Sequence, residues 1–169
     1  MSGGVIVSGA SRELAVAHWL ASAALNPQKA REEWDERDFA LLSCGTLFSA
    51  VRIPGEVVHA AAGTHDPQGV GEYLADALGE GPVIVDPVSQ RYYALVPASV
   101  ALRWNVASTV CLGRGSCVGV PHPRCTVPRH GRSYWSVPMD SAGMLCAPGD
   151  VALVARVGRS RQAAEAAQW

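Results

Sequence analysis

Long apolar runs and lysine are the two things this sequence most clearly lacks. No stretch of about 18 uncharged apolar residues occurs, so no membrane-spanning helix is expected. The first ten residues also lack a basic region followed by an apolar one, and we therefore predict a cytoplasmic protein. Lysine occurs once, at Lys29, among 14 basic residues. We attribute this excess of arginine to coding bias, so the arginine count alone is poor evidence for phosphate binding.

Charge and cysteine content narrow the class further. The formal net charge is -1, so no global field attracts nucleic acid or an anionic membrane surface, and any anion site must be local. Five cysteines are an odd number in 169 residues, which favours reduced thiols over a disulfide framework. With 49% hydrophobic and 17% charged residues, the chain is typical of a globular protein. We expect one globular domain over residues 1–157, followed by a polar C-terminal tail over 158–169.

The order of predicted elements indicates an α/β (α+β) domain. Periodicity and capping signals predict helices over 11–25, 27–37, 56–62, 66–78 and 148–157. β-branched and aromatic runs predict strands over 39–42, 46–53, 82–85, 92–96, 110–112, 117–120 and 134–137, with 82–96 and 110–120 forming hairpins. We expect a mostly antiparallel sheet of five to six strands. Helices 11–25 and 66–78 should pack on one face, and the other face should be partly open.

Two kinds of enzyme site remain open as alternatives. Cys111, Cys117, His122 and Cys125, with His130 in reserve, offer enough thiolate and imidazole groups for a zinc ion. Their spacing lacks the usual Cys-x2-4-Cys knuckle, and a packed strand cysteine explains Cys117 equally well.

Cys44, at a strand end, is the best-placed candidate for a thiol nucleophile, although buried structural cysteines are far more common. No Asp-x-Asp pair and no complete glycine-rich phosphate fingerprint occurs. We therefore expect no catalytic residues, no metal and no cofactor, with a small cysteine- or zinc-dependent enzyme as the last alternative.

The segment 121–132 is a local concentration of positive charge. It contains three arginines and two histidines without an acidic residue, and two aromatic residues follow it closely. Basic side chains beside aromatic rings suit a nucleic-acid backbone and its stacked bases. A solvated loop made basic by coding bias is the alternative. The candidate nucleic-acid-binding residues are Arg114, Arg124, Arg129, Arg132, Tyr134 and Trp135.

Three segments carry a family resemblance: LSCGTLFSAVRIP at 42–54, GPVIVDPVSQRYYALVP at 81–97 and LGRGSCVGVPHP at 112–123. Their order resembles that of bifunctional primase/polymerase (prim-pol) domains of the archaeo-eukaryotic primase superfamily. That family has a strand pair ending in metal-binding acids, then a hairpin bearing a histidine, then an Arg-Gly-x-Gly strand that closes on prolines. The resemblance covers about half of the chain and implies a primase-like fold.

The departures from the family pattern concern its chemistry. Val51, Arg52 and Ile53 stand where the metal-binding acids belong, and Arg91 and Tyr93 stand where the nucleotide-contacting histidine belongs. Without two carboxylates no divalent cation is held against a triphosphate.

The resemblance therefore implies a catalytically degenerate, non-catalytic module that binds single-stranded nucleic acid or a replication or regulatory protein. The alternative is a protein-interaction or scaffolding subunit that acts through an exposed sheet face. Homo-oligomerisation stays open, and no membrane partner is expected.

Overall fold

The computed structural model describes residues 9–168 and has an α+β fold, as predicted. Its helices are α1 (Gly9–Ala21), α2 (Pro27–Arg37), α3 (Gly55–Ala62), α4 (Pro67–Ala77) and α5 (Pro148–Ala166), with a 3-10 turn η1 (Ala98–Leu102). Its strands are β1 (Phe39–Ser43), β2 (Ser49–Pro54), β3 (Val83–Asp86), β4 (Arg91–Val96), β5 (Val110–Leu112), β6 (Cys117–Pro121) and β7 (Tyr134–Val137).

The strands form two antiparallel sheets. Five of them pair in the order β5-β2-β4-β3-β7, and β1 and β6 pair separately as a two-stranded ribbon. The predicted hairpin between β3 and β4 is confirmed, with Asp86 opposite Arg91 at its closed end. The Asp86 carboxylate accepts hydrogen bonds from the backbone N–H groups of Val88 and Ser89, which fixes the connecting turn.

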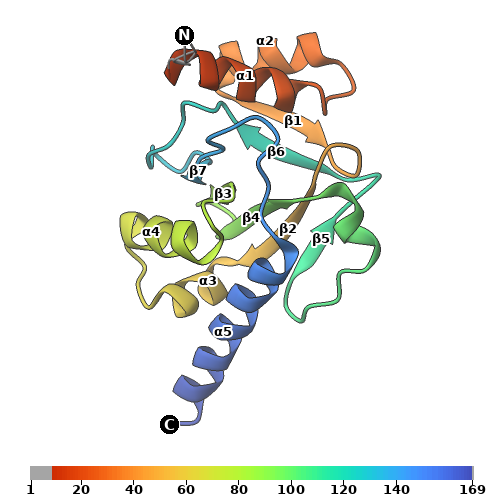
Figure 1. Cartoon of the computed structure of the whole chain (residues 1–169). Helices are drawn as coiled ribbons and strands as arrows, with labels where there is room; N and C mark the ends of the chain where they lie inside the picture. Colours follow the sequence, from red (N-terminus) through yellow and green to blue (C-terminus); the bar gives the residue numbers. More distant parts are fainter. Residues whose placement is uncertain (1–8, 169) are drawn as a thin grey trace, which may run out of the picture.

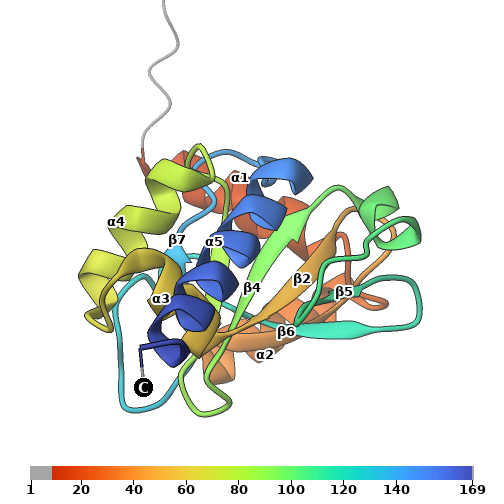
Figure 2. The same cartoon turned by 90° about the horizontal axis from the view of Figure 1, so that it is seen from below.

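Different layers pack against the two faces of the five-stranded sheet (Figure 1). On one face Val51 and Ile53 pack with α3, α4 and α5, and this helical layer lies toward the viewer in Figure 2. On the other face Ala50 and Leu95 pack with α1, α2 and the β1-β6 ribbon. The expectation that helices 11–25 and 66–78 share a face is therefore wrong, since Leu20 of α1 and Leu74 of α4 belong to separate cores.

Helix boundaries follow local chemistry where caps are strong. The Asn26 side chain accepts a hydrogen bond from the Lys29 N–H, and Asp66 accepts one from Gly69 in the same way, so α2 and α4 begin at the following prolines. The first helix ends earlier than its apolar spacing predicts, at Ala21, and Leu25 is 95% exposed.

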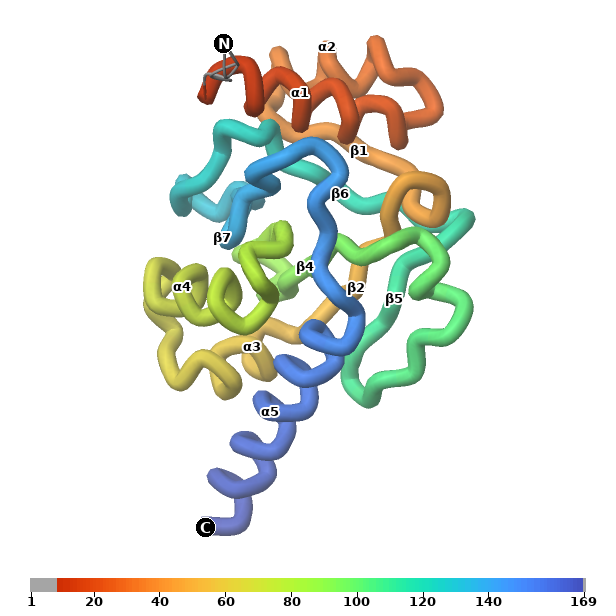
Figure 3. The backbone as a smooth tube through the Cα atoms, in the orientation of Figure 1, coloured from red at the N-terminus to blue at the C-terminus, as the bar shows by residue number. Residues whose placement is uncertain are grey.

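The predicted hairpin over 110–120 is wrong, because β5 pairs with β2 in the large sheet whereas β6 pairs with β1 in the ribbon. The chain crosses between the sheets three times, after β1, after β5 and after β6, as the tube in Figure 3 lets the reader follow. The first two crossovers touch at Gly45, where an added Cβ would lie 2.4 Å from the Arg114 nitrogen. Gly45 also has a φ of +95°, so only glycine fits this position without strain.

The C-terminal helix is longer than predicted, because it continues past Val157 to Ala166. Gly158 reads as a helix stop in the sequence, but here it lies inside α5 and is buried against α3. An added Cβ at Gly158 would lie 2.1 Å from the Val57 carbonyl oxygen. One turn later the Arg161 guanidinium donates to the carbonyl groups of Ala60 and Ala61. Gly158 and Arg161 therefore contact α3, whereas the rest of residues 159–166 is exposed apart from the partly buried Gln162.

Candidate functional site

The four arginines proposed from the sequence do not form one patch. Arg114 precedes β6, whereas Arg124, Arg129 and Arg132 follow it, and all four are exposed. The five residues of β6 separate the two positions by roughly 15 Å. The basic segment is thus a three-arginine loop at one end of the ribbon.

The two aromatic residues proposed for base stacking are core residues. Trp135 is 1% exposed, and its indole N–H donates to the Pro121 carbonyl at 3.1 Å. Tyr134 is 7% exposed and belongs to the core on the opposite face of the sheet. Because neither ring is accessible, the structure removes Tyr134 and Trp135 from the candidate site.

An acid from elsewhere in the chain joins the basic loop. Asp38, at the C-terminal cap of α2, accepts from Arg124 Nη2 at 2.6 Å through one carboxylate oxygen and from Arg129 Nη2 at 3.2 Å through the other. The two guanidinium groups hold the pKa of Asp38 below its ordinary value. The Asp38 carbonyl also accepts from the His122 N–H at 2.8 Å. Asp38 therefore ties the loop to the α2–β1 corner.

Three small hollows share lining residues with one another, and we call them together the arginine trough; the second of them is lined by both the ribbon and the large sheet. Their volumes are about 230, 320 and 330 Å³. Phe39 and Ser133 line both the first and the second, and Arg52 lines both the second and the third. The arginines that line the trough are Arg37, Arg52, Arg91, Arg129 and Arg132.

Strand alternation explains why the Arg52 guanidinium faces the arginine trough. Val51 and Ile53 point into the helical layer, so Arg52 between them points to the other face, opposite Tyr93 on β4. The ribbon covers Ala50 on that face but leaves Arg52 and Tyr93 partly exposed. The alternation of Val51, Arg52 and Ile53 was the one signal in the sequence that could have identified Arg52.

Most cations of the trough lack an acidic partner, while two of its three acids are engaged. Within residues 9–168, Arg37, Arg52, Arg91 and Arg132 form no ion pair. Of the acids, Asp38 is shared by two arginines, and the Asp86 carboxylate accepts hydrogen bonds from its own turn. The third, Glu56, lies in the first turn of α3. The trough therefore has an excess of positive charge.

The trough also has exposed aromatic side chains, but they are not the ones that the sequence predicts. Phe39 is 38% exposed and stands on the outer face of the ribbon. Its ring lies over Gly119, where an added Cβ would come within 2.0 Å of a ring carbon. Phe39 and the partly exposed Tyr93 line the same hollow. These two rings, rather than Tyr134 and Trp135, are available to stack on a ligand.

The alternative zinc site is not assembled. Among residues 9–168 no three His, Cys, Asp or Glu side chains are grouped closely enough to hold a metal ion. Cys111, Cys117, His122 and Cys125 are therefore not brought together. His122 Nδ1 accepts from the Arg124 N–H at 3.1 Å, and the buried Cys125 sulfur accepts from Arg129 at 3.3 Å.

The proposed nucleophile Cys44 is buried, with 2% exposure. Burial raises its pKa to about 12, and the neighbouring Cys117 and Cys111 add to the shift. A reactive cysteine needs the opposite change, because the thiolate is the nucleophile. Cys44 therefore has the environment of a structural cysteine.

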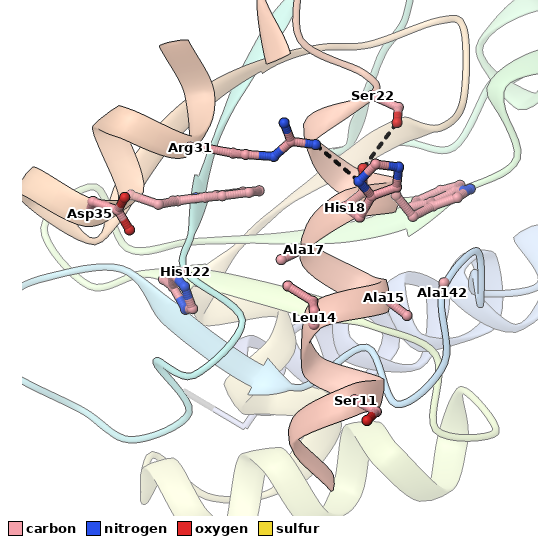
Figure 4. A pocket seen from close by; sticks show the side chains of 12 residues that line it. Ser11, Leu14, Ala15, Ala17, His18, Ser22, Arg31, Asp35, His122 and Ala142 are labelled. Atoms are coloured by element: carbon pink, nitrogen blue, oxygen red, sulfur yellow. Dashed lines mark hydrogen bonds between the residues drawn. The ribbon is translucent and has the colours of Figure 1, made fainter. Parts of the chain in front are cut away.

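A larger cavity than any of these three hollows lies between α1 and α2, with a volume of about 950 Å³ (Figure 4). Its walls are mainly apolar and include Leu14 and Trp34. Its main polar contact joins Arg31 Nη2 to His18 Nδ1 at 3.0 Å. Because this cavity has one arginine and the trough has five, the trough is the better candidate for an anionic ligand.

Comparisons of the chain with family models, with curated proteins and with solved structures find no match. Within the described residues, no helix is both long and apolar enough to cross a bilayer. The prim-pol resemblance can still be compared with the geometry at one place. Val51 and Ile53, which stand where the resemblance expects metal-binding acids, are ordinary core residues, and only Arg52 faces the trough.

Proposed function

We propose that this protein is a non-catalytic, primase-like module that binds single-stranded nucleic acid along the arginine trough. The observation that supports it best is the set of four arginines without ion pairs, placed beside the exposed Phe39 and the partly exposed Tyr93. Guanidinium groups bind phosphate oxygens, and aromatic rings stack on unpaired bases. In a duplex the bases are already stacked, so a single strand suits exposed rings better.

The residue of β2 that faces the trough argues against polymerase chemistry. A divalent cation at a primase-type site needs carboxylate ligands on the face of the strand that looks into the cleft. On β2 that position is Arg52, whose positive charge repels a cation. The proposal therefore keeps the resemblance to prim-pol domains and assigns the module a binding role, in replication or its regulation.

The test is fluorescence anisotropy of a labelled single-stranded oligonucleotide. If four arginines contact phosphates, the slope of log affinity against log salt should be about -3, so affinity should fall about 50-fold between about 50 mM and about 200 mM salt. The double variant Arg52→Gln/Arg132→Gln should weaken binding and reduce the slope. Arg159→Gln on α5, outside the trough, is the matched control. Absence of binding to both single-stranded DNA and RNA at low salt would overturn the proposal.

One observation favours the alternative of a protein-interaction subunit. The outer face of the ribbon exposes Phe39 and also Leu41, which is 58% exposed. An apolar strip of this kind suits contact with another protein or a second copy of this chain. Light scattering that finds dimers dissociated by Leu41→Glu, together with no nucleic-acid binding, would favour this role over the first.

A further inference from the structure

The Asp38 carboxylate lies between two guanidinium groups. Its two oxygens each accept one guanidinium donor, from Arg124 at 2.6 Å and from Arg129 at 3.2 Å. Asp38 is held there by its backbone, in the left-handed region with a φ of +58°, where its N–H donates to the Trp34 carbonyl. Two guanidinium groups around one anion form the arrangement by which arginines also bind phosphate.

Room for a second anion exists beside this carboxylate. A hollow of about 230 Å³ is lined by Asp38, Arg129, Arg37 and Arg132. The lining of this hollow thus carries three arginines and one carboxylate, and Arg124 pairs with the same carboxylate without lining the hollow. The ion pairs are also open to solvent, since the side chains of Arg124, Arg129 and Asp38 are 56%, 44% and 22% exposed. Exposed pairs of this kind are weak and can exchange partners.

We propose that Arg124 and Arg129 form a phosphate-binding subsite at one end of the arginine trough, which Asp38 fills in the free protein and a phosphate group of the ligand takes over. This inference rests on the proposed function and names its anchoring phosphate site. Asp38 is then an internal competitor: it orders the loop in the absence of ligand and lowers the affinity for phosphate. Arg37 and Arg132 stabilise the incoming phosphate during the exchange.

The test compares two neutralised acids on the same segment. Asp38→Asn keeps the shape and one acceptor oxygen but removes the competing charge. Asp35→Asn, three residues earlier in α2, removes an equal charge from an exposed residue that has no ion pair. Asp38→Asn should raise the affinity for labelled single-stranded DNA about five-fold more than Asp35→Asn, because it releases two exposed ion pairs. It should also steepen the salt dependence by about one.

A double-mutant cycle separates the subsite from any change in loop order. In an Arg124→Gln/Arg129→Gln background the gain in affinity from Asp38→Asn should vanish, since the two guanidinium charges of the subsite are already absent. A gain that persists in this background, or equal effects of Asp38→Asn and Asp35→Asn, would overturn the inference while leaving the proposed function in place.

Inorganic phosphate tests the subsite without nucleic acid. At constant ionic strength, phosphate should raise the thermal midpoint of Asp38→Asn more than that of the wild type, relative to chloride. Phosphate stabilisation without any oligonucleotide binding would keep the subsite and overturn the proposed function. Equal phosphate effects on both proteins would count against the subsite.

Discussion

The two faces of the five-stranded sheet are built from alternate residues of the same strands, yet their surroundings are opposite. On the helical face, Val51 and Ile53 are sealed beneath α3, α4 and α5 and are at most 2% exposed. On the ribbon face, the sheet surface beyond Ala50 is not covered by the ribbon, and the side chains that lie there are Arg52 and Tyr93. The apolar face stabilises the fold, and the open half of the other face presents the charge available for binding.

The largest expected difference between the two faces comes from placing an aspartate at each of two neighbouring residues of β2, Val51 and Arg52. Val51→Asp buries a carboxylate without a partner and should cost more than about 4 kcal/mol, enough to prevent folding. Arg52→Asp should change stability by no more than about 0.5 kcal/mol but lower single-stranded DNA affinity at least about ten-fold. Circular dichroism with urea unfolding measures the first effect, and anisotropy measures the second. A folded Val51→Asp, or unaltered DNA binding by Arg52→Asp, would contradict the division between the faces.

The second prediction tests how tightly the helical face is closed. Gly158→Ala places a Cβ against the Val57 carbonyl, so α5 must move away from α3, and stability should fall by about 2 kcal/mol. Gly149→Ala in the first turn of the same helix meets no atom within 4 Å and should be neutral or stabilising by up to about 1 kcal/mol. Urea unfolding of the two variants provides the comparison. Equal stabilities would show that the two helices do not cross so closely.

The third prediction tests whether the Phe39 ring in the trough stacks on a nucleic-acid base. Phe39→Ala should weaken single-stranded DNA binding about ten-fold, because it removes a surface on which a base can stack. Leu41→Ala changes a neighbouring exposed residue of the ribbon that has no ring and should have a much smaller effect. Anisotropy at low salt compares the two variants with the wild type. Similar losses in both would point to general apolar contact instead of stacking.

Elements specified by neighbouring residues were predictable from the sequence. The caps at Asn26 and Asp66 and the turn after Asp86 act within four residues, and the helices and hairpin that they bound were identified closely. The crossover of β5 and β6 between sheets was not predictable in this way. A glycine-rich turn between two short strands has the same local pattern whether the strands pair with each other or with different sheets.

The candidate site shows the same limit. The arginines of the loop were identified, but their carboxylate partner lies 86 and 91 residues away in the sequence, so the acid-free segment is not acid-free in space. The sequence predicts a surface ring at Trp135, because this residue follows a basic loop. It is buried because β7 is covered on both faces, and a strand covered on both faces carries no alternation of polarity.

The smallest expected effect is a pH dependence of stability that arises mainly on the helical face. His59 of α3 lies 3.3 Å from the Tyr92 hydroxyl through Nε2, and its ring centre is 4.6 Å from that of His65. Burial, and then the charge of His65, lowers the pKa of His59 below 6.5. Its proton is therefore bound more tightly in the unfolded chain, and stability should fall as the pH decreases through about 6.5. His122 adds a change of the same sign at the loop, since burial and Arg124 lower its pKa as well.

The urea midpoint should thus be lower at about pH 5.5 than at about pH 7.5, and His59→Gln should reduce the difference. A midpoint that does not change over this range would show that His59 is not held in its neutral form, because a group with the same pKa in both states contributes no pH dependence.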